Sequence, residues 1–182
     1  RGAEVTLVSG PTTKPVPAGV HVVKVPPTVE MHKAVMDSFQ DNSIIVKAAA
    51  VSDFRCAEQF DQKIKKDSSS LIMKLEQNPD ILKELGELCD HDRQLLIGFA
   101  AESSNIKEEG RKKLHAKELD LIAVNDISSA AAGFEVDNNQ VTLIDSAGEV
   151  QLLHTSKLKT ADLIWDHVIT NKMLKPAVSN SP

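Results

Sequence analysis

The sequence predicts an α/β fold built on a mainly parallel sheet with helices on both faces. Apolar segments typical of strands alternate with amphipathic segments typical of helices along most of the 182 residues. This alternation favours parallel strands joined by helical crossovers. Near the C-terminus the alternation stops, and two apolar segments flank the turn "DSAGE" at residues 145–149. Strands joined by so short a turn predict an antiparallel hairpin.

The first predicted elements are two strands, a helix and a third strand, at residues 4–9, 20–25, 28–40 and 43–51. Thr28 is the expected cap of the helix, because its hydroxyl can accept a hydrogen bond from the first turn. One face of this helix is apolar and carries Met31, Ala34, Val35 and Phe39. The third strand is almost continuously apolar, which is typical of a central strand in a parallel sheet.

The middle of the chain starts with an irregular polar stretch at residues 52–70, after which "LIMKL" at 71–75 predicts a short strand. Asn78 followed by Pro79 predicts a helix start, since asparagine favours the cap and proline the first helical position. The later elements are predicted at residues 94–99 (strand), 105–117 (helix) and 120–124 (strand).

After the hairpin within residues 138–154, residues 157–171 predict a final helix and residues 176–182 a loose tail. The final helix is amphipathic, and we expect it to bury Leu158, Ile164, Trp165 and Val168.

Composition narrows the class of protein. A net charge of −5 gives no reason to expect binding to nucleic acid or to a membrane surface. The two cysteines, Cys56 and Cys89, lack metal-ligand spacing and favour a reducing compartment. The sequence contains no signal peptide and no apolar run of membrane-spanning length. We therefore expect a cytoplasmic protein.

Ligands of parallel α/β sheets bind beyond the carboxyl ends of the strands, so residues just after each strand are candidates. Gly10 either makes a turn or lets the backbone approach a nucleotide closely. Asp53 follows small residues that include Ala49 and Ala50, which leave room for a ligand. Its carboxylate is either a solvated turn residue or a group that holds a metal ion or a ribose hydroxyl.

Two further groups suggest phosphate binding, each with an ordinary structural alternative. Asn78, Pro79 and Asp80 form a helix start, where backbone amides can also bind phosphate. Lys113 and Lys117 lie four residues apart on one helix face, where they form either a solvated stripe or a clamp on a polyphosphate. The lysines of "KIKK" at residues 63–66 are equally ambiguous on their own.

Seven short segments occur in one order along the chain, namely "VTLVSGPT", "AAAVSDFR", "QKIKK", "NPDIL", "GFAAES", "AVNDIS" and "GFEVDNNQVTLI". Each segment alone is weak, but seven in one order are specific. Together they resemble phosphopantothenoylcysteine synthetase, the amide-forming enzyme of coenzyme A biosynthesis. The likeness covers about residues 3–171 and is strongest to the bacterial form, the C-terminal half of a bifunctional protein.

The resemblance implies a Rossmann-like three-layer sandwich with a projecting dimerisation flap, and therefore a homodimer. It implies one synthetase domain at residues 1–175 and a tail at 176–182. In the implied reaction, CTP activates 4'-phosphopantothenate as an acyl-cytidylate and pyrophosphate leaves. Cysteine then displaces CMP to give 4'-phosphopantothenoylcysteine. Mg²⁺ accompanies CTP, and FMN is implied only if the parent chain carries the decarboxylase half.

The resemblance also implies residue roles. Asp53 resembles the aspartate beside the nucleotide and its metal, and Lys63 resembles the catalytic lysine of a flap that closes over the phosphates. Ala49 and Ala50 would form the wall near the acyl phosphate. The other implied nucleotide contacts are Asn78, Pro79, Asp80, Ile81, Phe99, Lys113 and Lys117. No metal ligand set is assigned.

The family's first strand, phosphate loop and helix have no counterpart in this sequence. We therefore expect residues 1–182 alone to bind nucleotide weakly and to form no amide. Two alternatives stay open: a nucleotide-binding fragment without catalysis, and an NAD(P)-dependent reductase suggested only by topology. The absence of GxGxxG from the sequence weighs against the reductase. The choice between CTP and ATP also stays open.

Overall fold

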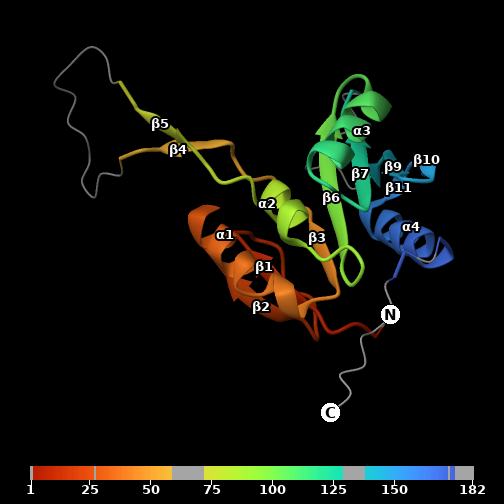
Figure 1. Cartoon of the computed structure of the whole chain (residues 1–182), viewed down its shortest axis with the longest axis horizontal. Coiled ribbons are helices and arrows are strands. Elements are labelled where there is room, and N and C mark those ends of the chain that lie inside the picture. The colour runs from red at the N-terminus through yellow and green to blue at the C-terminus, as the bar shows by residue number, and fades with distance from the viewer. Residues whose placement is uncertain (1, 27, 59–71, 129–137, 172, 175–182) are drawn as a thin grey trace. The chain divides into compact units, whose positions relative to one another are not determined.

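The computed structural model describes residues 2–26, 28–58, 72–128, 138–171 and 173–174 (Figure 1). The chain forms two compact units, Arg1–Asp37 with Ala50–Ile81 and Ser38–Ala49 with Leu82–Pro182. No helix within the described ranges is both long and apolar enough to cross a membrane.

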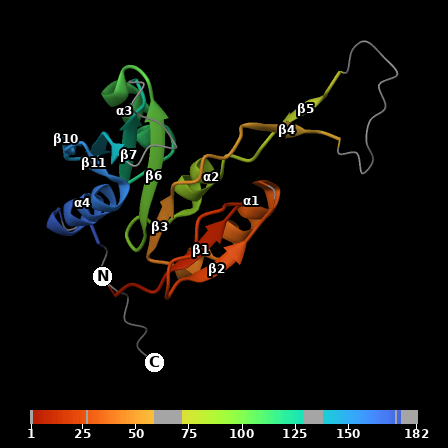
Figure 2. The ribbon, with the colours of Figure 1, turned by 180° about the vertical axis from the view of Figure 1, so that it is seen from behind.

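The first unit contains a parallel strand pair covered by a helix (Figure 2). Strand β1 (Thr6–Ser9) pairs with β2 (His21–Lys24), and α1 (Thr28–Met36) packs against β1. Both predicted strands are confirmed, but the helix predicted to residue 40 ends at Met36. Aspartate and serine follow at 37 and 38, and such side chains compete with the helix for backbone hydrogen bonds. Phe39 instead begins a short 3₁₀ turn, η1 (Phe39–Asp41), in the second unit.

The first unit also contains a small antiparallel pair, β4 (Phe54–Cys56) with β5 (Leu75–Gln77). Two predictions were wrong here, because β4 lies in a stretch predicted to be irregular and "LIMKL" contributes only Leu75 to β5. Ile72 is 93% exposed, so apolarity did not decide the pairing. The guanidinium of Arg55 bonds to Glu76 and to the Gln77 carbonyl across the pair, an interaction that hydrophobic periodicity does not register.

The second unit is built on a five-stranded sheet of order β10-β9-β7-β6-β3. Its parallel strands are β3 (Ile44–Lys47), β6 (Leu95–Glu102) and β7 (Leu121–Asp126). The antiparallel hairpin of β9 (Val141–Asp145) and β10 (Gly148–Gln151) continues from β7. This mixed sheet confirms the predicted fold class. Within the described sheet, however, β3 is a terminal strand rather than the predicted central one, and Val46 is 45% exposed.

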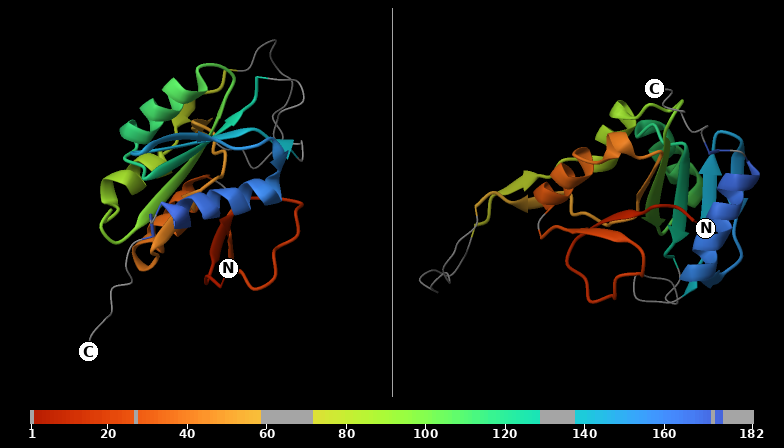
Figure 3. Two further views of the ribbon diagram at one scale, coloured as in Figure 1. Left: turned by 90° about the vertical axis from the view of Figure 1, so that its right-hand side faces the viewer. Right: turned by 90° about the horizontal axis from the view of Figure 1, so that it is seen from below.

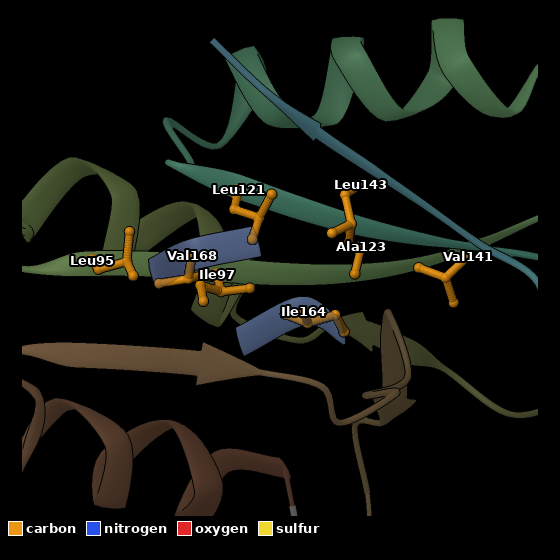
Figure 4. Close-up of a cluster of buried hydrophobic side chains, with 8 residues drawn as sticks. All are labelled: Leu95, Ile97, Leu121, Ala123, Val141, Leu143, Ile164 and Val168. Atoms are coloured by element: carbon orange, nitrogen blue, oxygen red, sulfur yellow. The ribbon is translucent and has the colours of Figure 1, made fainter. Parts of the chain in front are cut away.

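Helices cover both faces of this sheet (Figure 3). On one face, α4 (Lys157–Thr170) buries Ile164 and Val168 against Leu95, Ile97, Leu121, Ala123, Val141 and Leu143 (Figure 4). On the other face, Leu82 of α2 (Ile81–Leu88) lies over Gly98, and Gly110 of α3 (Ile106–Ala116) lies over Val124 and Ile144. The unit therefore has three layers: two helices, the sheet and α4.

The final helix is confirmed over residues 157–170, with one error in its buried face. Trp165 packs against the core at its edge, but Leu158 is 79% exposed. Leu158 precedes Ile164 by six residues and so lies about 120° away from it around the helix. Ser156 caps the helix by accepting a hydrogen bond from the Lys159 amide. It belongs to β11 (Thr155–Ser156), which pairs with β8 (Asn138–Asn139).

Candidate functional site

Asn78 and Asp53, two of the predicted site residues, are joined within the first unit. The backbone amide of Asn78 donates to the Asp53 carbonyl at 2.8 Å, and its side-chain amide donates to the Ser52 carbonyl at 2.8 Å. Asn78 is buried, whereas Asp53 is exposed. The Asn78 bonds therefore fix the backbone that carries Asp53 and leave its carboxylate facing solvent.

Arg55 completes this arrangement, and it was not among the predicted site residues. Its guanidinium donates to Asn78 Oδ1 at 3.0 Å, to the Gln77 carbonyl at 3.1 Å and to Glu76 Oε2 at 3.1 Å. Asn78 therefore uses its side-chain oxygen and nitrogen inside the protein. We call Ser52, Asp53, Arg55 and Asn78 the strand-end clasp. A charged residue directly after "VSDF" in the sequence was the available signal for Arg55.

The clasp also corrects the predicted helix start. Asn78 was expected to cap the helix with Pro79 at its first position, but α2 begins at Ile81. The Asn78 side-chain oxygen accepts a hydrogen bond from Arg55, and the side-chain amide donates to the Ser52 carbonyl, so the side chain does not act as the predicted cap. Pro79 and Asp80 therefore form the link between the clasp and the helix, and Ile81 is buried at its start.

Gly10 lies on a pocket of the first unit with a volume of about 610 Å³. A Cβ at Gly10 would meet the Met31 methyl group at 3.6 Å, an ordinary contact, so packing alone does not require glycine. The pocket is lined by prolines and aliphatic side chains, with Lys14 and Lys24 among its polar members. Close approach of a nucleotide at Gly10 stays a prediction.

Ala49 and Ala50 both follow β3 and both are exposed. The strand ends at Lys47 instead of the predicted residue 51, so the alanines belong to the connection and not to the sheet. The boundary between the two units falls between them. Their exposure fits the expected wall for a ligand, although it does not identify one.

Phe99 and Lys113 lie at the carboxyl end of β6 and on the neighbouring helix of the second unit. Phe99 is partly buried and packs at the edge of the core beneath α4. On the opposite side, Lys113 of α3 donates to the carboxylate of Glu102, the last residue of β6. The side chain of Lys113 is 42% exposed and that of Glu102 is 18% exposed.

Lys117 lies just beyond α3 and not within it. Its amide still bonds to the Lys113 carbonyl at 3.1 Å, so the two lysines are one helical turn apart. The expected common helical face is therefore only approximate. The Lys117 carbonyl lies directly over Gly86 of α2, so this turn packs closely against α2.

Two polar residues end β7 beside Glu102. Hydrogen bonds from Ser128 keep the pKa of the Asp126 carboxyl below its ordinary value, so this carboxylate stays ionised to a lower pH than an ordinary aspartate. Within the described part of the chain, Asn125 Oδ1 is buried and accepts no hydrogen bond. The segment "AVNDIS" signalled this position, but no role was predicted for it.

The predicted site residues are divided between the units. Lys63 lies outside the described residues, so its catalytic role stays a prediction. Among the residues that the structure describes, no group of three or more histidine, cysteine, aspartate or glutamate side chains is placed to hold a metal ion. The first unit holds Gly10, Ala50, Asp53, Asn78, Pro79, Asp80 and Ile81, and the second holds Ala49, Phe99, Lys113 and Lys117.

Known proteins are similar to this chain in sequence and in fold. The chain is 41% identical over 173 residues to the coenzyme A biosynthesis bifunctional protein CoaBC of Escherichia coli K12, covering 93% of this chain and 42% of that protein. It is 42% identical over 148 residues to CoaBC of Bacillus subtilis, covering 81% of this chain and 36% of that protein. A crystal structure of the C-terminal domain of CoaBC superposes with a TM-score of 0.76 at 35% identity, covering 94% of this chain and 76% of that one.

The chain spans about two fifths of the E. coli relative. Residues 1–172 match a family described as the DNA/pantothenate metabolism flavoprotein C-terminal domain. The sequence relatives, the matching fold and this family match agree. This chain belongs to the family of DNA/pantothenate metabolism flavoprotein C-terminal domains.

Proposed function

We propose that this domain catalyses the phosphopantothenate–cysteine ligase reaction of coenzyme A biosynthesis in the cytoplasm, with CTP as the activating nucleotide. A carboxylate oxygen of 4'-phosphopantothenate attacks the α-phosphorus of CTP, and the bond to the β-phosphate oxygen breaks. The cysteine amine then attacks the acyl carbon, and CMP leaves. The strand-end clasp is the observation that carries the proposal, because it fixes Asp53 and Asn78, two expected nucleotide residues, at one place.

The residues fit a metal ion that arrives with the nucleotide. Mg²⁺ commonly binds through one or two carboxylates and the substrate phosphates rather than in an all-protein cage. Asp53 offers one exposed carboxylate on a backbone that Asn78 holds in place. Bound Mg²⁺ would neutralise part of the triphosphate charge. No other ligand is assigned, and no residue described here is assigned to FMN.

The chain's cations would oppose the charge repulsion between a carboxylate and a triphosphate. In our proposal Lys113 and Lys117 bind the phosphates, while Lys63 acts as the positively charged group over the reacting phosphorus. A donor that acts mainly in the transition state changes the rate more than it changes nucleotide binding. Loss of such a preorganised donor typically slows a reaction about 10²–10³-fold.

The test is single-turnover release of pyrophosphate by the full-length enzyme, with CTP and phosphopantothenate present and cysteine omitted. We expect Lys63→Gln to slow release about 10²–10³-fold, and the matched control Lys66→Gln to slow it less than about tenfold. Normal release by Lys63→Gln, with failure only after cysteine is added, would assign Lys63 to the second half-reaction. Thermal stabilisation by NADP alone, and not by CTP or ATP, would contradict the ligase proposal.

We also propose a homodimer formed through the β4–β5 pair. Four large apolar side chains on or beside this pair are exposed, namely Phe54 (56%), Ile72 (93%), Met73 (64%) and Leu75 (55%). Their burial against a second copy would remove apolar surface from water. Light scattering should give a dimer, and Leu75→Lys should shift it towards monomer while the already exposed Leu153→Lys should not. A full-length protein that remains monomeric at micromolar concentration would contradict the proposal.

A further inference from the structure

The lysine and arginine side chains of α3 all form ion pairs, but with different kinds of partner. Lys112 pairs with Glu108 and Glu109 on its own helix, at 2.9 and 2.8 Å. Lys113 instead reaches the sheet and pairs with Glu102, the last residue of β6. The remaining two, Lys107 and Arg111, pair with Glu149 of β10.

The Lys113–Glu102 pair is asymmetric. The Glu102 side chain is 18% exposed, whereas that of Lys113 is 42% exposed. The backbone of Glu102 is fixed, because it is in register with Asp126 and its carbonyl accepts a bond from the Ile127 amide at 2.9 Å. An ammonium group has three donors. The carboxylate therefore holds the ammonium from the protein side, and the lysine remains the more accessible partner.

We infer that Glu102 is a positioning residue that holds Lys113 ready for the nucleotide's polyphosphate. The inference rests on the proposed function, in which Lys113 binds the nucleotide. A lysine side chain loses much rotamer freedom when it is fixed on a ligand. Glu102 restricts Lys113 before the nucleotide arrives, so less freedom is lost on binding.

An opposing effect must be separated from positioning. The Glu102 carboxylate is negative and lies close to Lys113, so it also repels the phosphates that Lys113 would bind. Glu102→Asp keeps the charge but shortens the side chain and withdraws it from Lys113. Glu102→Gln keeps the length and an acceptor oxygen but removes the charge. If Glu102 acts mainly by positioning Lys113, Glu102→Asp should weaken nucleotide binding and Glu102→Gln should not. If Glu102 acts mainly by repelling the phosphates, Glu102→Gln should strengthen nucleotide binding and Glu102→Asp should leave it unchanged.

The experiment measures kcat and KM for CTP and for cysteine in the full-length enzyme. We expect Glu102→Asp to raise the KM for CTP about three- to tenfold, the range for one immobilised side chain. The value of kcat and the KM for cysteine should stay unchanged, because Lys113 binds the nucleotide equally before and during the reaction. Glu102→Gln should remain within about twofold of the wild type.

A double-mutant cycle tests whether Glu102 acts through Lys113. In a Lys113→Ala background, Glu102→Asp should cause no further rise in the KM for CTP, because its partner is gone. Glu109→Asp is the matched control, since it shortens the carboxylate that pairs with Lys112 at 2.8 Å and should leave the KM unchanged. The inference would be overturned if Glu102→Asp raised the KM for CTP equally in the wild-type and Lys113→Ala backgrounds. It would also be overturned if Glu102→Gln lowered the KM for CTP.

The same cycle separates this inference from the function on which it rests. If Lys113→Ala raises the KM for CTP and Glu102→Asp does not, positioning by Glu102 is wrong and the nucleotide role of Lys113 stands. If Lys113→Ala leaves the KM for CTP unchanged, both the nucleotide role and the inference are wrong.

Discussion

Gly86 of α2 lies against the backbone that connects α3 to β7, and an added methyl group there should destabilise the second unit. A Cβ at Gly86 would lie 2.8 Å from the Lys117 carbonyl carbon and 3.2 Å from Glu118 Cβ. Glu118 already has a left-handed backbone, with φ of 47°. The obstacle is therefore a constrained backbone and not the end of a flexible side chain.

Two opposing terms set the size of the effect. Alanine is favoured over glycine inside a helix by about 1 kcal/mol. Overpacking a filled interior costs about 1–3 kcal/mol, and we take the upper end because a backbone carbonyl cannot rotate away. The net loss for Gly86→Ala is about 2 kcal/mol. For a domain of this size, this corresponds to a fall in Tm of about 4–8 °C.

Thermal unfolding followed by circular dichroism measures this effect. The control is Glu87→Ala, a change at the exposed neighbouring position of the same helix, which should shift the free energy of unfolding by less than about 0.5 kcal/mol. A Gly86→Ala protein as stable as the wild type would refute the reasoning, since it would require the Lys117 backbone to move at no cost.

Three further outcomes are expected. Gly110→Ala should lower the free energy of unfolding by about 1 kcal/mol, because the new Cβ would lie 2.5 Å from Ile144 Cδ1 and 2.8 Å from Val124 Cγ2. Ile144→Val should therefore cost less stability in the Gly110→Ala background than in the wild type, and equal costs would count against this contact. Burial raises the pKa of the Cys89 thiol to about 11, so iodoacetamide at pH 8 should alkylate exposed Cys56 before Cys89. Peptide mass spectrometry would measure the two rates, and faster alkylation of Cys89 would contradict this expectation. Pairing with Lys107 and Arg111 of α3 lowers the pKa of the Glu149 carboxyl below its ordinary value. This carboxylate therefore stabilises the fold at neutral pH and loses its contribution as the pH falls through the lowered pKa. Denaturant unfolding should show a smaller acid loss of stability in Glu149→Gln than in the wild type, and identical acid curves would contradict this expectation.

The sequence predicted those elements whose burial follows a regular period. Three such elements are all present: the strand predicted at residues 94–99, the helix predicted at 105–117 and the last helix. Each places apolar side chains in the core at regular intervals along the sequence. The structure extends the first of these strands to Glu102, since the small residues after Phe99 remain compatible with pairing to β7.

Pairing between polar segments was not predictable in the same way. The β4–β5 pair depends on Arg55, which contacts residues more than twenty positions away in the sequence. Local propensity carries no information about such a partner. For the same reason Asn78 was mistaken for a helix cap, although Asp53, another residue of the strand-end clasp, was identified as a candidate just after the predicted strand.

The candidate site was predicted by resemblance more than by physical pattern. Single residues such as Asp53 and Lys113 each had an ordinary structural alternative, and spacing alone could not decide between the readings. The ion pair of Lys113 with Glu102 depends on the packing of α3 beside β6 (Figure 1), which has no local signature. Glu102 was visible in the segment "GFAAES", but its partner was not.

Strand β4, which ends at Cys56, has a consequence for the amine that we propose to be catalytic, that of Lys63. Lys63 follows Cys56 by seven residues in the sequence, and a stretch of seven residues spans at most about 25 Å when fully extended. Confinement to a sphere of this radius corresponds to an effective concentration on the order of 10 mM. In the proposed function, a free primary amine offered to a Lys63→Ala enzyme would therefore have to reach about this concentration to replace the tethered amine.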